Sequence, residues 1–492
     1  MQKTSIRKHH KWLGLALSLF LLMFCVSGLV LNHRQLVADC NVSRAVLPAR
    51  YEFSDWNNGL LRGTAKVADK IVVYGSAGMF MTDSTFRKFS DFNEGLPAGA
   101  DYRQIRDIAS TAGGHIFAAS PFALYRYGLH GAWNTLAVPL ADGERITDVA
   151  AHGDTLVVLG RSYVYTSLPP YRKFARTTIP EPDGFDRRPT AFRTVWMLHS
   201  GELFGVWGKT VVDLVAIAIA VLCVTGIVFW AMKKWRSVRH VPTMRMSLSW
   251  HDSIGRTTIA LALLVCITGW CLRPPLMIPL ALGKVPAVPG STLDSRNAWN
   301  DRLRLVRYDA DMGDWLVSTS EGFYSLGSDI SHPSPRLLKH TPPVSVMGLN
   351  VWQKCKDGRW ICGSFSGIFA WDRAHGTSTD YLTGKPAPHK AGAPFGNVAV
   401  AGYTDDFCHG QKADKATVER EGIVVEYDKG TKAFSQPEWM NTLPMSLWNV
   451  ALEIHSGRIY IGAIATYIFV FVMGIGAIWC LWTGERIRKK KK

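Results

Sequence analysis

Residues 10–32 have the sequence HKWLGLALSLFLLMFCVSGLVLN. Beyond its second residue this stretch carries no charged side chain, and it is long enough to cross a bilayer core about 30 Å thick. Three further stretches, 203–232, 257–280 and 459–482, are also long and apolar. The sequence therefore predicts a membrane protein with four spanning helices.

Two of the four stretches follow one template. The positions that recur at identical spacing are His10, Gly14, Cys25 and Gly28 in the first, and His251, Gly255, Cys266 and Gly269 in the second. The other two stretches follow the phrases LHSGELFG, which contains His199, and IHSGRIYIG, which contains His455. An ionisable side chain at the mouth of a membrane helix is a functional hypothesis by default. Four histidines in this duplicated arrangement indicate paired imidazoles that hold a shared metal centre, with haem as the leading candidate.

Basic residues mark one side of the membrane. They precede the first stretch, fill the link between the second and third, and follow the fourth as Arg486, Arg488 and the lysines 489–492. The positive-inside rule then places both termini and the link in the cytoplasm, and two large segments, 34–198 and 281–453, outside. Much of the formal charge of +17 lies on the cytoplasmic ends, where anionic membrane lipid attracts it, so it does not indicate nucleic-acid binding.

The two outer segments contain a recurring β pattern. Its copies are DKIVVYGSAGMFMTD, GGHIFAASPFALYRY, GDTLVVLGRSYVYTS, GDWLVSTSEGFYSLG and DGRWICGSFSGIFAWD. Such repetition favours a β-propeller assembled from both segments, and the copies resemble blades of periplasmic sensor propellers of two-component systems. The alternative is a set of ordinary hairpins in two independent β domains. Cys355 and Cys362 flank the turn of the last copy, where a cross-strand disulfide is one interpretation.

The helix sequences resemble a known family. KHHKWLGLALSLFLLMFCVSGLVL and LHSGELFGVWGKTVVDLVAIAIAVLCVTGIVFW look like the first two helices of the PepSY-associated transmembrane proteins, including the His-x-Trp-x-Gly opening and a closing Ser/Thr-Gly pair. The resemblance implies an inner-membrane reductase containing b-type haem, with reduction of a ferric siderophore as its role. Three features depart from the family pattern: HDSIG lacks the tryptophan of the first copy, the final helix is shorter after its histidine, and the outer segments look like propeller blades rather than a PepSY domain.

Bis-histidine ligation of haem needs two neutral imidazoles that face each other across the iron. In a bundle whose halves are related by a pseudo-twofold axis, equivalent residues meet across that axis. We therefore expect His10 with His251 at the cytoplasmic edge and His199 with His455 at the outer edge, holding two b haems. His33 lies roughly 34 Å of helix from His10, so the two cannot share one iron.

His33 and Asp213 need separate interpretations. His33 is a further candidate ligand that would replace a member of the outer pair, and an interfacial hydrogen-bonding histidine is the alternative. Asp213 is an acidic residue within a spanning helix. Burying it in the membrane is unfavourable in free energy unless it has a partner or contacts water. Lys209 is its candidate partner at i−4 spacing, while a haem-propionate environment or a proton path is the functional alternative.

Two functions of different classes fit these features. The first is a transmembrane electron conduit that reduces a periplasmic ferric siderophore or other iron chelate. No G-x-G-x-x-G motif opening a βαβ unit is present, so a quinol or a separate reductase must supply the electrons. The acceptor would dock on the β segments, whose second part is rich in tryptophan, although packing in the propeller core is the favoured interpretation for each individual tryptophan. The second function is a non-enzymatic membrane-anchored propeller sensor or assembly partner.

The predicted architecture is an α-helical membrane bundle with an all-β extracytoplasmic part, in the bacterial inner membrane. Its successive parts are an N-terminus and first helix at 1–33, a β segment at 34–198, a second helix at 199–233, a cytoplasmic link at 234–250, a third helix at 251–280, a second β segment at 281–453, and a fourth helix with a basic tail at 454–492.

Overall fold

The computed structural model describes residues 3–235, 241–345, 347–388, 398–407, 422–461 and 463–487. The chain forms two compact units, each built from separated stretches. The first, which we call the bundle unit, comprises 1–37, 186–296 and 447–492. The second, the β unit, comprises 38–185 and 297–446.

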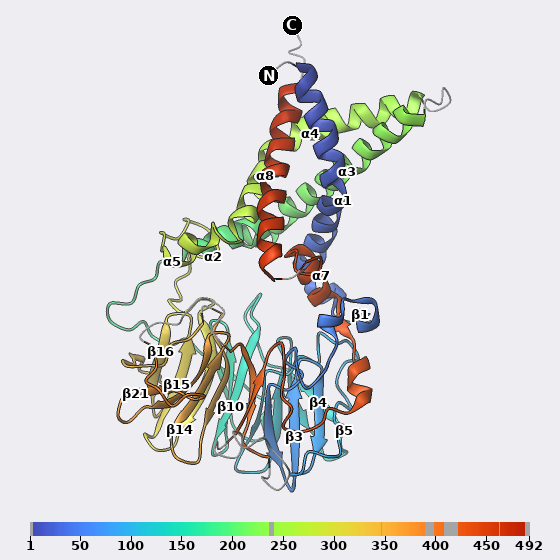
Figure 1. Ribbon diagram of the computed structural model, residues 1–492. Coiled ribbons are helices and arrows are strands. Elements are labelled where there is room, and N and C mark those ends of the chain that lie inside the picture. Colours follow the sequence, from blue (N-terminus) through green and yellow to red (C-terminus); the bar gives the residue numbers. More distant parts are fainter. Residues whose placement is uncertain are drawn as a thin grey trace. The chain divides into compact units, whose positions relative to one another are not determined.

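Four long helices form the core of the bundle unit (Figure 1). They are α1 (Lys3–Asn32), α3 (Gly205–Trp235), α4 (Val241–Cys271) and α8 (Ala463–Ile487). All four are long and apolar enough to cross a membrane, which confirms the predicted number of spans within the described part of the chain. Three shorter helices accompany them, α2 (Ala191–Ser200), α5 (Met277–Leu282) and α7 (Leu447–His455).

The long helices pack in a cyclic order. α1 contacts α3 and α8, and α4 contacts the same two helices, so the duplicated helices α1 and α4 occupy diagonal positions. Leu19, Leu214 and Ile468 are each more than half exposed on the outer faces of different helices. Large apolar side chains on the outside are expected where lipid rather than water is the solvent.

Several predicted boundaries differ from the observed ones. α1 and α4 begin well before their apolar stretches, so most of the predicted link 234–250 is helical where it is described. The bundle unit also takes up 34–37, 186–198, 281–296 and 447–453, which the sequence assigned to the outer segments. The reason is that α2 packs against α4, and α7 packs against α1.

The β unit consists of small antiparallel sheets. The four-stranded sheets are β2 (Gly63–Val67) to β5 (Ser90–Asp91), β6 (Asp107–Ser110) to β9 (Trp133–Leu136), β10 (Ile146–His152) to β13 (Ala175–Thr177), β14 (Leu303–Asp309) to β17 (Arg336–Leu337) and β18 (Leu349–Lys354) to β21 (Thr377–Asp380). Their middle strands are β3 (Lys70–Gly75), β4 (Gly78–Thr82), β7 (Ile116–Ala119), β8 (Leu124–Tyr127), β11 (Thr155–Gly160), β12 (Val164–Ser167), β15 (Asp314–Thr319), β16 (Gly322–Gly327), β19 (Trp360–Ser364) and β20 (Gly367–Asp372). Two-stranded sheets are formed by β22 (Val400–Thr404) with β23 (Ile423–Glu426), and by β1 (Asn41–Val42) with β24 (Met445–Ser446).

The first strands of six sheets contact one another in a closed cycle, from β2 through β6, β10, β14, β18 and β22 back to β2. Six apolar clusters fill the spaces between neighbouring sheets, and the one that joins the last sheet to the first includes Ile423, Val73 and Trp56. This is the arrangement of a β-propeller, with three sheets from each chain segment. The five recurring sequence phrases form the central hairpin of five successive sheets.

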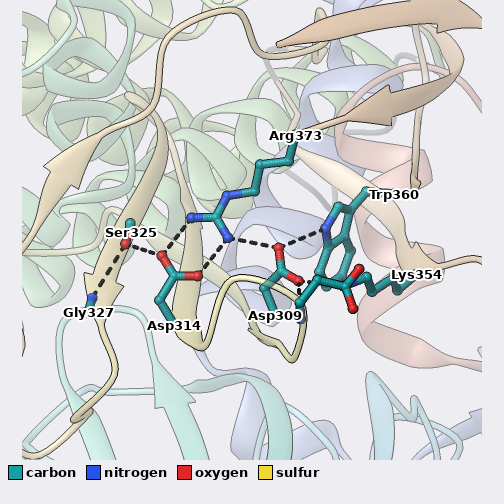
Figure 2. Close-up of polar contacts among 8 residues, drawn as sticks. Asp309, Asp314, Ser325, Gly327, Lys354, Trp360 and Arg373 are labelled. Atoms are coloured by element: carbon teal, nitrogen blue, oxygen red, sulfur yellow. Dashed lines mark hydrogen bonds and ion pairs between the residues drawn. The ribbon is translucent and has the colours of Figure 1, made fainter. Parts of the chain in front are cut away.

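Charged side chains are buried between sheets as well (Figure 2). Arg373, which is 7% exposed, donates to Asp309 at 2.7 Å and to both carboxylate oxygens of Asp314 at 2.6 Å. Lys354 also pairs with Asp309, and Trp360 Nε1 donates to the same carboxylate at 3.4 Å. Buried charges are tolerated when each is paired and hydrogen-bonded, which this network provides between two adjacent sheets.

The cross-strand disulfide considered for the second outer segment is not present. Cys355 and Cys362 are both free thiols and lie in different apolar clusters, because Cys362 pairs in register with Trp352 instead. The tryptophans of this segment are at most 2% exposed and fill the spaces between sheets, so they are core residues and not a docking surface; they are Trp299, Trp315, Trp352, Trp360 and Trp371.

Candidate functional site

The bundle unit brings four histidines together in two pairs. The first pair is His10 of α1 with His251 of α4, whose ring centroids are 6.0 Å apart with planes at 76°. The second pair is His199 with His455, at 5.9 Å and 46°. These are the pairs that the duplicated template predicts.

The second pair does not lie on the spanning helices, contrary to expectation. His199 is near the end of α2 and His455 is the last residue of α7, and each is followed by Ser-Gly. Gly201 and Gly457 have φ of +80° and +77°, a left-handed conformation that suits glycine and ends a helix. The His-Ser-Gly phrase is therefore a helix stop, which fixes each histidine at the end of a short helix before the chain turns into the membrane.

Each of the four imidazoles is anchored through Nδ1 in the same way. Nδ1 contacts one backbone carbonyl and one hydroxyl three residues further along the same helix. The contacts are His10 with Cys480 O (3.0 Å) and Thr483 (3.3 Å), His251 with Leu222 O (3.0 Å) and Thr225 (3.2 Å), His199 with Val265 O (3.1 Å) and Thr268 (3.2 Å), and His455 with Phe24 O (3.0 Å) and Ser27 (3.1 Å).

These contacts determine where each imidazole carries its proton. A carbonyl oxygen can only accept, so Nδ1 must be the protonated nitrogen. The hydroxyls agree, because each donates to a carbonyl of its own helix, as Thr268 does to Leu264 at 2.7 Å, and leaves an oxygen lone pair for Nδ1–H. Nε2 of each histidine therefore keeps its lone pair, and it makes no hydrogen bond to another described residue.

A glycine follows each anchoring hydroxyl and lies against the imidazole. A Cβ added at these glycines would approach the ring Cε1 to 3.1 Å at Gly484, 3.5 Å at Gly226, 2.7 Å at Gly269 and 3.2 Å at Gly28. A side chain at Gly269 in particular would displace His199. Gly14 and Gly255 have a different role, because they face Cys480 Sγ and Leu222 on neighbouring helices.

The anchoring is reciprocal within each half of the bundle. His10 of α1 donates to a carbonyl of α8, while His455, just before α8, donates to a carbonyl of α1. In the same way His251 of α4 donates to a carbonyl of α3, while His199, just before α3, donates to a carbonyl of α4. Each Ser/Thr-Gly dipeptide therefore serves the histidine of its partner helix.

The geometry fits two opposed imidazole ligands on one metal. Metal–imidazole bonds of about 2 Å on both sides separate the ring centroids by roughly 6 Å, close to both observed spacings. Metal-bound histidines almost always donate their other N–H to a carbonyl or similar acceptor, as these four do. Among the described residues no group of three or more histidine, cysteine or acidic side chains could hold a metal by itself. Two ligands per site are what a haem, which supplies four nitrogens of its own, requires from the protein.

Burial keeps the second pair uncharged. It holds the pKa of His199 below its usual value and lowers that of His455 to about 4, with the neighbouring His199 as the next contribution. Both imidazoles are therefore neutral near pH 7, which is the state that binds a metal.

The remaining candidates lie elsewhere. His33 Nε2 contacts Asp213 at 2.8 Å, and Asn32 donates to the same carboxylate at 2.9 Å, so the structure does not bring His33 to either pair. Lys209 is not the partner of Asp213, because it pairs with Glu202 at 3.0 Å. His9 precedes His10 in the sequence and would compete with it as a ligand, but it is exposed on a different face of α1.

The four anchoring dipeptides were only partly recognised from the sequence. Ser27-Gly28 was noted as a family feature, but its equivalents in the other helices were not connected with the histidines. The signal is present as CVSG, CVTG, CITG and CLWTG, which recur near the end of all four spanning helices.

These features define a four-helix membrane protein whose bundle carries two anchored histidine pairs. A model of the PepSY-associated TM region matches residues 7–490, which is nearly the whole chain, and the protein therefore belongs to this family. The search of curated proteins gives no match.

Solved structures with similarity to this chain are extracellular domains from B. thetaiotaomicron. That of a one-component system matches 66% of this chain and 34% of its own, at 10% identity and a TM-score of 0.25. That of a hybrid two-component system matches 69% of this chain and 37% of its own, at 9% identity and a TM-score of 0.28. This chain thus spans little more than a third of either of those proteins.

Proposed function

We propose that this protein holds two b-type haems, one between His10 and His251 and one between His199 and His455, and conducts electrons across the membrane to an external ferric chelate. The observation that carries the proposal is the fourfold anchoring of Nδ1. It leaves Nε2 free on both members of each pair, and a bundle used only as an anchor has no need of that arrangement.

Residues around each pair would orient the imidazoles, leave room for them and keep them neutral. The carbonyl and hydroxyl acceptors hold each imidazole in one tautomer and one orientation, and the adjacent glycine leaves room for the ring. Burial keeps the second pair neutral and ready to bind. Bound haem would supply reversible one-electron oxidation and reduction at each iron.

The separation of the two pairs supports a route across the membrane. His10 lies in α1, and Ser27, which anchors His455, lies later in the same helix. At 1.5 Å per residue these positions are roughly 26 Å apart, most of the thickness of a bilayer core. Two redox centres at this spacing along one helix suit transfer between the two faces of the membrane.

The basic flanks support an orientation with both termini in the cytoplasm and the propeller outside the inner membrane. In that orientation electrons enter near the first pair and leave near the second. The donor would be a quinol in the membrane, which loses two electrons and two protons for every two ferric ions reduced to the ferrous state, or a separate reductase that supplies one electron for each ferric ion. A ferric siderophore or another iron chelate would be the acceptor, because Fe²⁺ binds such oxygen-rich ligands less tightly than Fe³⁺ and is released.

Spectroscopy of the purified full-length protein tests this proposal. We expect two haems per chain, low-spin spectra of bis-imidazole type, and reoxidation of the reduced protein by a ferric chelate. A correctly folded but colourless protein from haem-replete cells would contradict the proposal and favour a membrane-anchored sensor or assembly partner. Cysteine accessibility in intact cells tests the orientation separately.

A further inference from the structure

The two histidine pairs differ in the charges around them. Next to the first pair are the uncharged groups of Cys480, Thr483 and Thr225. The charged side chains close to it are exposed: Asp252 and Arg256 on α4 pair with each other, and Lys8, Lys11 and Arg486 are exposed on α1 and α8. Near the second pair lie Glu453, Arg458 and Arg273, and only two of these three are mutually neutralised.

Arg458 and Glu453 form that neutralised pair. Arg458 Nε donates to Glu453 Oε2 at 2.9 Å, and a second guanidinium nitrogen contacts the other carboxylate oxygen. A bidentate contact of this kind satisfies both partners. The positive charge of Arg273 is therefore left without an equivalent acid.

Arg273 lies just beyond the end of α4, four residues after Gly269, the glycine that packs against His199. Its backbone carbonyl accepts from Met277 N at 3.0 Å, which keeps this part of the chain in a turn above the helix end. The side chain forms no hydrogen bond or ion pair with any other residue in the described part of the chain.

Arg273 lies close to the second pair and far from the first. Gly269, which packs against His199, is one helical turn before it, whereas His251 lies 20 residues before the end of α4, roughly 30 Å of helix away. Burial, followed by the neighbouring Arg458, lowers the pKa of Arg273 to about 10, so the guanidinium remains charged at neutral pH. A half-buried cation without a partner needs an anion, and the planar guanidinium fork matches a carboxylate best.

We propose that Arg273 binds the carboxylate side chains of the haem held by the second pair, and that its charge makes this site easier to reduce than the first. The inference rests on the proposed function. A nearby cation stabilises the added electron, so electrons flow preferentially from the first pair toward the second.

Redox titration of the holoprotein tests this inference. In Arg273→Gln we expect the midpoint potential of the second site to fall by about 59 mV. For a one-electron couple this is a tenfold change in the equilibrium constant for reduction. Arg273→Lys keeps the positive charge, so the midpoint potential of the second site should stay close to the wild-type value. Arg245→Gln, which removes an exposed arginine near the start of α4, is the matched control and should leave both potentials unchanged. His199→Ala, which leaves only the first site loaded, identifies which potential belongs to which site.

The outcomes separate this inference from the function on which it rests. A wild-type protein without haem overturns both. Two haems in Arg273→Gln with both potentials unchanged overturn the role of Arg273 and leave the dihaem proposal intact. If Arg273→Gln does not fold, the wild-type potentials decide: a second site with the higher potential supports the inference, and a second site that is no easier to reduce than the first contradicts it.

Discussion

The bundle and the β unit both bury polar side chains, but they satisfy them differently. In the network between two adjacent propeller sheets each buried charge meets an opposite charge, as Arg373 does with Asp309 and Asp314 (Figure 2). In the bundle each buried imidazole is held on one nitrogen only. A polar group that is satisfied on all sides stabilises a fold, whereas one that is fixed on one side and open on the other is prepared for a ligand. The difference therefore separates structural polar groups from functional ones.

The strongest test of this distinction removes an open imidazole. His10→Ala and His251→Ala should each abolish or convert to high spin the same haem, and His199→Ala and His455→Ala the other. A double replacement within one pair should add little to either single replacement, because the two residues act as a unit. Haem content and spectra measure the effect, and His33→Ala is the control that should retain both haems. Loss of a haem in His33→Ala would show that the ligand assignment is wrong.

The next test breaks a closed network in the propeller. Arg373→Ala leaves two buried carboxylates without their shared cation, which should cost about 3–5 kcal/mol of unfolding free energy. Denaturant unfolding followed by tryptophan fluorescence measures this loss, while haem spectra should stay unchanged. Arg359→Ala removes a largely exposed arginine that pairs with Asp357, and should cost at most about 1 kcal/mol. Equal effects of the two substitutions would remove the distinction between buried and exposed pairs.

An anchoring hydroxyl should matter less than the imidazole that it holds. Thr268→Val keeps the shape of the side chain but removes an acceptor for His199, and we expect haem at the second site to bind about 10–100-fold more weakly. Thr258→Val on the same helix is the matched control, because the Thr258 hydroxyl contacts only Ile254 O of its own helix. Competition of each variant with an apo-haem acceptor measures the affinity. Equal affinities in the two variants would mean that the carbonyl alone orients the ring.

The smallest expected effect is a loss of stability of the β unit at acid pH. Burial raises the pKa of Asp309, but the contacts with Lys354 and Arg373 outweigh it and hold the pKa below its usual value. A depressed carboxyl pKa adds stability above the pKa of the unfolded chain, about 4, and this contribution is lost as the pH falls below that value. Unfolding of the β unit between pH 7 and pH 3 should show the loss. Asp309→Asn should reduce this dependence, and an unchanged slope would contradict the assignment.

The sequence was sufficient for the features that repeat within it. The four spans follow from apolar length, and the pairing of His10 with His251 follows from the duplicated template. The propeller was recognisable from five of its six sheets, because their central hairpins share one pattern. The sixth sheet, β22 with β23, lacks that pattern, and residues 408–421 between its strands, which include Cys408, lie outside the described residues.

Other features depend on contacts between distant parts of the chain. Asp213 has a lysine one turn earlier, yet its partners are Asn32 and His33 of another helix, which helical spacing cannot reveal. Likewise, the acceptor for His10 lies 473 residues away at Thr483. The His-Ser-Gly phrases were correctly selected but placed at the start of spanning helices, whereas their left-handed glycines end short ones.

The reciprocal anchoring has a consequence for biosynthesis. His10 is made early and enters the membrane with α1, but its Nδ1 acceptors belong to α8, the last helix of the chain. Until α8 has been inserted beside α1, this imidazole has neither its fixed tautomer nor its orientation. The second pair is also incomplete until His455 has been synthesised. Neither pair can therefore reach its final geometry while the chain is still emerging, and loading of the proposed haems would follow assembly of all four helices.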